Sequence, residues 1–351
     1  MTIKEFAYTA QQHYRAQTGQ TFKRTHIYEL LAASFGYNSF AALCAESVII
    51  PSEKNSNSSL MYIPEVRNRC IELGYLPEIA NLLSNSFPTF IAERQIRIVN
   101  ITELKSIIDE RFMDDDDLIS PELIAGLELA TVDANALAHY GLALIYGSND
   151  DDDGGEVGAD YWYNQEKNGR ILTGVEKEWA DEYKSKMTND EKYEFHLREA
   201  GRLGNEEALL DLAERFNDPT FFEKVKVSSD HDPRRVFEIA ELLGRDNDLH
   251  SWLTIAAESG DIYAMRRLIE EFDQNDLMRC WTWMYLAQLL ETDLSKDNYH
   301  AIHENGSLYD DDVGGPMFVD GEQGIELRPL NIEQDILAQQ SAQKLFDKIN
   351  V

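Results

Sequence analysis

The chain has 351 residues, of which 64 are acidic and 32 are basic, for a formal net charge of −32. A charge of this size repels nucleic acid and membrane headgroups and attracts a basic partner. No apolar run approaches the roughly 18 residues of a membrane-spanning helix, and the N-terminal residues lack the apolar segment of a signal peptide, so we expect a cytoplasmic protein.

Residues 1–50 predict a small N-terminal helical hairpin region. After an amphipathic helix, the string THIYELLAASFGYNSFAALCAE indicates helix, turn and helix. We expect Thr25 to cap the first helix, Gly36 to end it, and Asn38 or Ser39 to begin the next. The spacing is similar to that of a DNA-reading helix-turn-helix. Its second helix carries no arginine, lysine or glutamine that could reach base edges, so a structural hairpin is favoured.

Residues 51–60 are small and polar, which predicts a linker, and residues 61–130 predict a helical region. Prolines recur in this region near the starts of helical patterns, where the missing N–H costs nothing. These prolines are Pro64, Pro77, Pro88 and Pro121. Between them, residues 94–101 (RQIRIVNI) alternate in the manner of a β-strand whose partner the sequence does not identify.

Two segments of the chain repeat each other. LREAGRLGNEEALLDLAERF, from Leu197, aligns with LTIAAESGDIYAMRRLIEEF, from Leu253, with identical leucine, alanine, glycine and phenylalanine positions. Each copy predicts two helices joined at a glycine, Gly204 or Gly260. Asn205 or Asp261 follows as the N-cap of the second helix. Small residues on both helices would let the pair approach closely.

Further helices are predicted around these copies. Thr188 and Glu191 have capping-box spacing and predict a helix start. The apolar periodicity places helices at about 190–202, 206–216, 233–243, 249–258, 262–272 and 276–290.

The repeated segments resemble the Sel-one-like repeats, a branch of the tetratricopeptide-like helical repeats. AAESGDIYAMRRL and AGRLGNEEALLDL match the family's join between units, ANALAHYGLALIYG is similar to its opening helix, and GADYWYNQEKNG is similar to its aromatic second helix. The resemblance covers roughly residues 131–295. It implies a short, mostly α superhelical array that acts in protein–protein interaction and has no catalytic residue or cofactor.

Residues 296–351 differ in composition, being rich in glycine and aspartate before a final apolar stripe. We expect a short hairpin in which Phe318 and Val319 face Ile325 and Leu327. Asn331 then opens a last helix, which is placed to cap the array.

Acidic loops are the first candidates for chemistry. Asn149, Asp151, Asp153 and Asp160 occupy calcium-loop positions, but the closing residue is Asp and a solvated loop is favoured over a metal site. His300, His303 and Glu304 have helical ligand spacing without a third ligand pattern. The three cysteines lack metal spacing, and no nucleophile or phosphate-loop motif is present, so we expect a protein that is not an enzyme.

Aromatic residues of the repeat region are expected mainly to fill the core. Trp281 and Trp283 are two residues apart and cannot both face one core, so one of them is expected to face a partner. The candidate partner-binding residues are Trp281, Trp283, Tyr161, Trp162, Asp150, Asp151, Asp152, Asp153, Asp310, Asp311 and Asp312.

The sequence thus favours an acidic repeat scaffold that binds a basic partner protein and neither nucleic acid nor membrane. A bacterial immunity or inhibitor protein is one form of this hypothesis. A nucleic-acid mimic, whose carboxylates imitate phosphates, and a calcium- or metal-regulated module are the alternatives. The oligomeric state is left open.

Overall fold

The computed structural model describes residues 3–51, 62–105, 108, 119–147, 160–228, 230–310 and 315–350. The chain divides into two compact units, residues 1–212 and 213–351. The mostly α class predicted from the sequence is confirmed for the described residues, together with two small antiparallel sheets. None of the described helices is long and apolar enough to cross a membrane.

The N-terminal part of the first unit is a helical cluster around aromatic and aliphatic side chains. Ser39 caps the third helix by accepting from the Ala42 N–H. Thr25 is not a cap, because the extended residue before the second helix is Lys23, whose carbonyl accepts from the Ile27 N–H. The helices are α1 (Ile3–Thr18), α2 (Arg24–Ser34), α3 (Phe40–Glu46), α4 (Ile63–Glu72) and α5 (Pro77–Glu93).

The strand predicted at residues 94–101 is confirmed as β2 (Ile96–Asn100). It pairs antiparallel with β1 (Ser47–Pro51), with Ile49 opposite Ile98. Pro88 was predicted near a helix start, but it lies inside α5. The helix continues through it because its neighbours on one face are buried, and that burial outweighs the one missing backbone bond.

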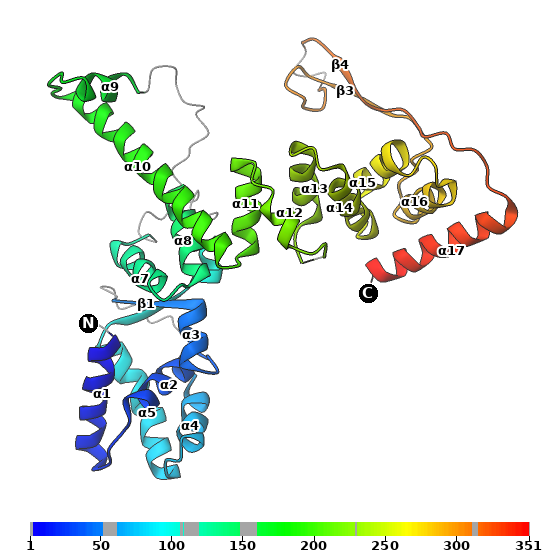
Figure 1. Ribbon diagram of the computed structural model, residues 1–351. Helices are drawn as coiled ribbons and strands as arrows, with labels where there is room; N and C mark the ends of the chain where they lie inside the picture. The colour runs from blue at the N-terminus through cyan, green and yellow to red at the C-terminus, as the bar shows by residue number, and fades with distance from the viewer. Residues whose placement is uncertain are drawn as a thin grey trace. The chain divides into compact units, whose positions relative to one another are not determined.

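Past β2, the chain forms η1 (Ile101–Glu103), α7 (Pro121–Thr131), α8 (Ala136–Gly147), α9 (Tyr161–Lys167) and α10 (Val175–Arg202). Figure 1 shows α8 beside the C-terminal part of α10 and α9 at its other end. The capping box predicted at Thr188 is wrong. Thr188 lies within α10, where its hydroxyl donates to the Lys184 carbonyl.

Both copies of the sequence repeat form two helices joined at a glycine, as predicted. The first joins α10 to α11 (Glu206–Phe216), and the second joins α14 (Asp246–Glu258) to α15 (Ile262–Arg267). Gly204 and Gly260 have φ of 96° and 99°, which is the left-handed conformation that ends a helix. Asn205 and Asp261 cap the following helices by accepting from the N–H three residues on.

The second unit also contains α12 (Thr220–Lys224), α13 (Pro233–Leu242), the π-helical turn η3 (Leu268–Phe272) and α16 (Leu277–Leu289). Gly244, between α13 and α14, has φ of 64°. The Arg245 N–H there donates to the Ala240 carbonyl, as the Asp261 N–H does to Ala256. The unit therefore repeats one glycine-based helix end at successive helices.

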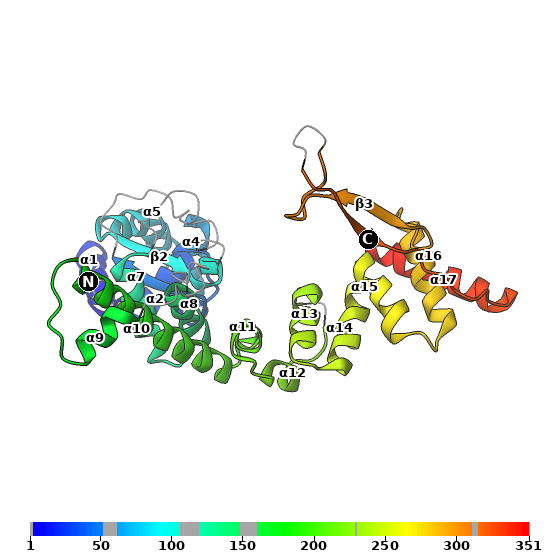
Figure 2. The same ribbon diagram turned by 90° about the horizontal axis from the view of Figure 1, so that it is seen from above.

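The C-terminal segment pairs differently from the prediction. β3 (Asn298–Ile302) pairs antiparallel with β4 (Phe318–Glu322), so Phe318 lies opposite Ile302 and not opposite Ile325 or Leu327. Figure 2 shows this hairpin extending from the second unit, with α17 (Ile332–Ile349) beside α16. Asn331 caps α17 by accepting from the Gln334 N–H, as predicted.

Candidate interaction surfaces

Exposed apolar side chains gather on α9, the turn after it and the first turns of α10. We call this set, together with the half-buried Trp162, the α9–α10 surface; it consists of Tyr161, Trp162, Ile171, Val175 and Trp179. Tyr161 and Trp179 are 50% and 53% exposed, and Ile171 is 89% exposed. Val175 and Trp179 are four residues apart and so share one face of α10. Exposed apolar patches are typical of sites at which proteins contact other molecules, so these residues are candidates for such a site.

Polar and aromatic contacts hold α9 against α10. Lys177 on α10 contacts Glu166 at 2.7 Å, and the ring centroids of Tyr163 and Tyr183 lie 5.5 Å apart. The pKa of Lys177 is raised by its hydrogen bonds to Asp181 and Glu166.

No residue of α9 is buried. Its position therefore depends on these contacts and not on a core of its own.

Trp162 is fixed at the edge of this surface. Its ring lies 4.9 Å from that of Tyr161 at an interplanar angle of 80°, and the Arg170 guanidinium lies 4.8 Å from its centroid. Arg170 is in turn paired with Glu176 at 3.1 Å. Cation–π contacts of this kind hold a ring in one orientation while leaving part of it accessible.

The acidic candidates before α9 fall mostly outside the described residues. Asn149 and Asp150–Asp153 lie outside the described residues. Asp311 and Asp312, near the C-terminal hairpin, lie outside them as well. Asp160 is described, and its carboxylate accepts from the Asn164 side chain. Within the described ranges, no group of three His, Cys, Asp or Glu residues could hold a metal ion.

The two tryptophans of α16 have different surroundings. Trp283 is 3% exposed, and its indole N–H donates to the buried carboxylate of Asp273 at 3.0 Å. Trp281 is partly exposed, and its indole N–H donates to the Arg328 carbonyl at 2.8 Å. Their opposite faces agree with the two-residue spacing. The indole N–H of Trp281, a candidate for contact with a partner, is thus bonded to the segment that precedes α17.

Asp273 organises the interior around Trp283. Its carboxylate also lies 3.0 Å from Arg279 Nε and 3.2 Å from His250 Nε2. Its carbonyl accepts from the Cys280 thiol, whose pKa burial raises to about 11. A buried carboxylate with several donors is a structural anchor, because removing it leaves those donors unpaired.

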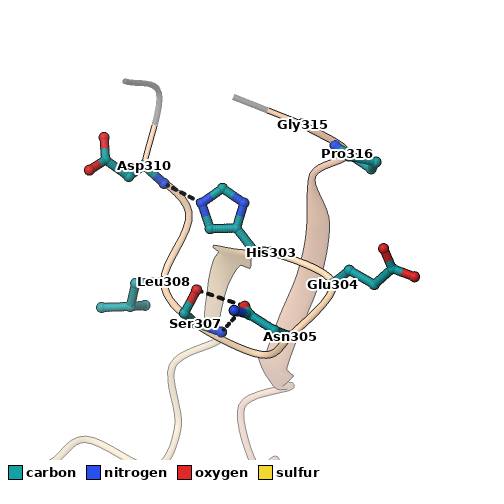
Figure 3. A pocket seen from close by; sticks show the side chains of 8 residues that line it. All are labelled: His303, Glu304, Asn305, Ser307, Leu308, Asp310, Gly315 and Pro316. Atoms are coloured by element: carbon teal, nitrogen blue, oxygen red, sulfur yellow. Dashed lines mark hydrogen bonds between the residues drawn. The ribbon is translucent and has the colours of Figure 1, made fainter. Parts of the chain in front are cut away.

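A pocket of about 540 Å³ lies beside the β3–β4 hairpin. Here His303 follows a strand, so the helical ligand spacing predicted for His300 and His303 is wrong. His303 Nε2 accepts from the Asp310 main-chain N–H at 3.1 Å. Figure 3 shows the carboxylates of Glu304 and Asp310 pointing away from this imidazole. The pocket therefore presents a main-chain donor to the ring and not a carboxylate.

Sequence reasoning missed a histidine pair between α8 and α10. Nδ1 of His139 lies 3.0 Å from Nδ1 of His196, and the ring centroids lie 5.2 Å apart. One nitrogen must donate and the other accept, so the pair holds one shared proton at this contact. Burial, followed by the neighbouring imidazole, lowers the pKa of His196 to about 4. The residues are 57 positions apart, and no local pattern joins them.

Comparison with family models, with curated proteins and with solved structures found no match to this chain.

Proposed function

We propose that this chain is a non-enzymatic helical scaffold that binds a partner protein through the α9–α10 surface. The observation that carries the proposal is the exposure of Ile171, just before α10, and of Val175 and Trp179 on α10, whose C-terminal part is packed against α8. Aromatic and aliphatic side chains presented from a helix supply the central contacts of protein interfaces. A fixed helix lowers the entropic cost of using them.

Charge favours a basic partner. The chain carries a net charge of −32, and six acidic residues between positions 149 and 160 directly precede Tyr161 in the sequence. Acidic groups near an apolar contact raise the association rate of a basic protein. Added salt screens this attraction and lowers their contribution. An immunity or inhibitor role would use this same chemistry against a basic toxin or nuclease.

The helical pairs support the interaction role by analogy. The Sel-one-like resemblance rests on segments that include the joins AGRLGNEEALLDL and AAESGDIYAMRRL, and a further helix in the second unit ends at a left-handed glycine, Gly244. Helical-repeat scaffolds of this kind present surfaces to other macromolecules, and the analogy adds no specific contact residue.

Affinity capture with the full-length chain tests the proposal. We expect the wild-type protein to retain a stoichiometric partner from an extract of its native host, with retention falling as salt is raised. The double variant Ile171→Ala/Trp179→Ala should lose that partner while keeping its helical circular dichroism, since both side chains are exposed.

The matched control is Leu242→Ala, which removes an exposed aliphatic side chain from α13. It should capture as the wild type does. Equal capture by the double variant, or no stoichiometric partner at low salt, would overturn the proposal.

A further inference from the structure

An extended segment crosses the helices of the second unit between β4 and α17. We call it the strap and define it as residues 323–330. Two helix side chains hold its main chain: Arg266 Nη2 donates to the Gln323 carbonyl at 3.0 Å, and Trp281 Nε1 donates to the Arg328 carbonyl at 2.8 Å. Contacts to main-chain carbonyls hold an extended peptide with little regard to its side chains.

One side chain of the strap is buried. Ile325 is 9% exposed, whereas its neighbours Glu326 and Arg328 are exposed. The Ile325 N–H donates to the Leu294 carbonyl at 2.8 Å. The preceding Gly324 N–H donates to the Asp297 carboxylate, also at 2.8 Å. Ile325 is therefore the apolar anchor of the strap.

Gly324 permits a close approach of the two backbones. A Cβ at this position would lie 2.2 Å from the Ser295 carbonyl oxygen, a distance that real Cβ atoms do not adopt. The site therefore selects glycine directly before the aliphatic anchor.

Arg266 adds a requirement for a carboxylate in any segment that replaces the strap. Its side chain is 8% exposed and pairs with Glu270 at 2.7 Å and with Glu322 at 2.6 Å. Glu322 immediately precedes the strap. If the strap left, the buried guanidinium would lose both this carboxylate and the Gln323 carbonyl, which is costly unless a replacement supplies them.

The strap does not fill the space beneath it. A cleft of about 490 Å³ remains between the strap, η3 and the start of α16, lined in part by Ile269, Gln274 and Cys280. A segment with a larger side chain than the strap's own could use this volume.

We propose that α15, η3 and α16 form a groove for an extended peptide, which the strap occupies in cis. The partner segment carries a carboxylate three residues before an aliphatic side chain, with glycine directly before the aliphatic, in the order of Glu322, Gly324 and Ile325. This inference goes beyond the proposed function, because it concerns a different surface and a different partner chemistry.

A synthetic peptide of residues 319–330 is the probe. The variant Ile325→Asp loosens the strap in the full-length chain by placing a charge at its buried anchor. We expect this variant to bind the peptide at least about tenfold more tightly than the wild-type protein, whose groove is occupied. Control peptides carrying Ile325→Asp or Gly324→Ala should not bind.

A second variant keeps the test independent of how Ile325→Asp folds. Trp281→Phe removes the indole donor and keeps the aromatic ring. We expect faster amide exchange at Ile325 in this variant, with the helical circular dichroism unchanged. Equal peptide binding by wild type and Ile325→Asp, binding of both control peptides, or unchanged exchange in Trp281→Phe would each overturn the proposal.

Discussion

The tryptophan side chains have different surroundings in the two units. In the second unit, Trp252 and Trp283 are 1% and 3% exposed, and Trp283 is anchored on Asp273. In the first unit, Trp179 is 53% exposed, and the rings of α9 rest on surface contacts. Trp252 and Trp283 are therefore part of the core in the second unit, whereas Trp179 lies exposed on the surface of the first.

The polar interiors differ in the same way. The second unit places a carboxylate, Asp273, among an indole, a guanidinium and an imidazole. The first unit places two imidazoles, His139 and His196, against each other. A carboxylate is matched by cationic donors, whereas two imidazoles are compatible only while at least one remains neutral. The units should therefore respond differently to acid.

The largest expected effect is a difference in stability between variants of a buried and of an exposed tryptophan. Trp252→Ala removes a fully buried side chain and should lower the free energy of unfolding by about 4 kcal/mol. Trp179→Ala removes an exposed one and should change it by less than about 0.5 kcal/mol. Urea unfolding of both variants measures the difference. A similar decrease in the free energy of unfolding in both variants would contradict the difference between the two units.

Acid should act on the histidine pair of the first unit. Burial and the neighbouring imidazole hold the pKa of His196 at about 4, below the 6.5 of an unperturbed histidine. The unfolded chain then binds more protons than the folded one. The contribution of the pair is complete above pH 6.5 and is lost as the pH falls toward 4. We expect that loss to be about 2 kcal/mol, since the site is partly solvated.

The variant His196→Phe keeps a ring against Tyr146 and removes the titrating group. For each protein, we compare the free energy of unfolding at pH 6.5 with that at pH 4.5. The readout is the difference between the wild-type loss and the variant loss, since the many surface carboxylates titrate equally in both proteins. Acidification should lower the free energy of unfolding less in the variant than in the wild type. Identical losses would show that the pair does not exclude a second proton.

The smallest expected effect is the loss of stability when the helix-ending glycine is replaced in either copy of the repeat. Gly204→Ala and Gly260→Ala each place a Cβ on a left-handed residue and should cost about 1 kcal/mol. A Cβ at Gly204 meets no atom within 4 Å, and one at Gly260 meets Ile349 at an ordinary 3.6 Å. Thermal unfolding should therefore show similar losses. A much larger loss at Gly260 would mean that α17 packs more tightly there than this spacing indicates.

Local signals in the sequence predicted much of the helical fold. The glycine ends and N-caps at Gly204, Asn205, Gly260 and Asp261 were correct, because each depends on residues within one turn. The start of α10 at Val175 was missed, since its first turns are largely charged and show little apolar periodicity.

Contacts between distant residues could not be predicted. The strand at Ile96–Asn100 was correct, but its partner Ser47–Pro51 is about 50 residues away. β4 was assigned to the wrong partner for the same reason, since its true partner β3 precedes it by 16 residues or more. Among the candidate site residues, the two-residue spacing predicted that Trp281 and Trp283 do not both face one core, and their indoles do have different partners. That one of them faces a partner protein stays a prediction. The exposed Trp179 had no distinguishing signal.

Site-specific photo-cross-linking tests the central claim most directly. A photoreactive phenylalanine derivative placed at position 179 in the full-length chain, in its native host, should form a covalent adduct with one partner protein. The same probe at position 242, which is exposed on α13, should form none with that partner. Adducts of equal yield from both positions, or none from position 179, would contradict binding at the α9–α10 surface.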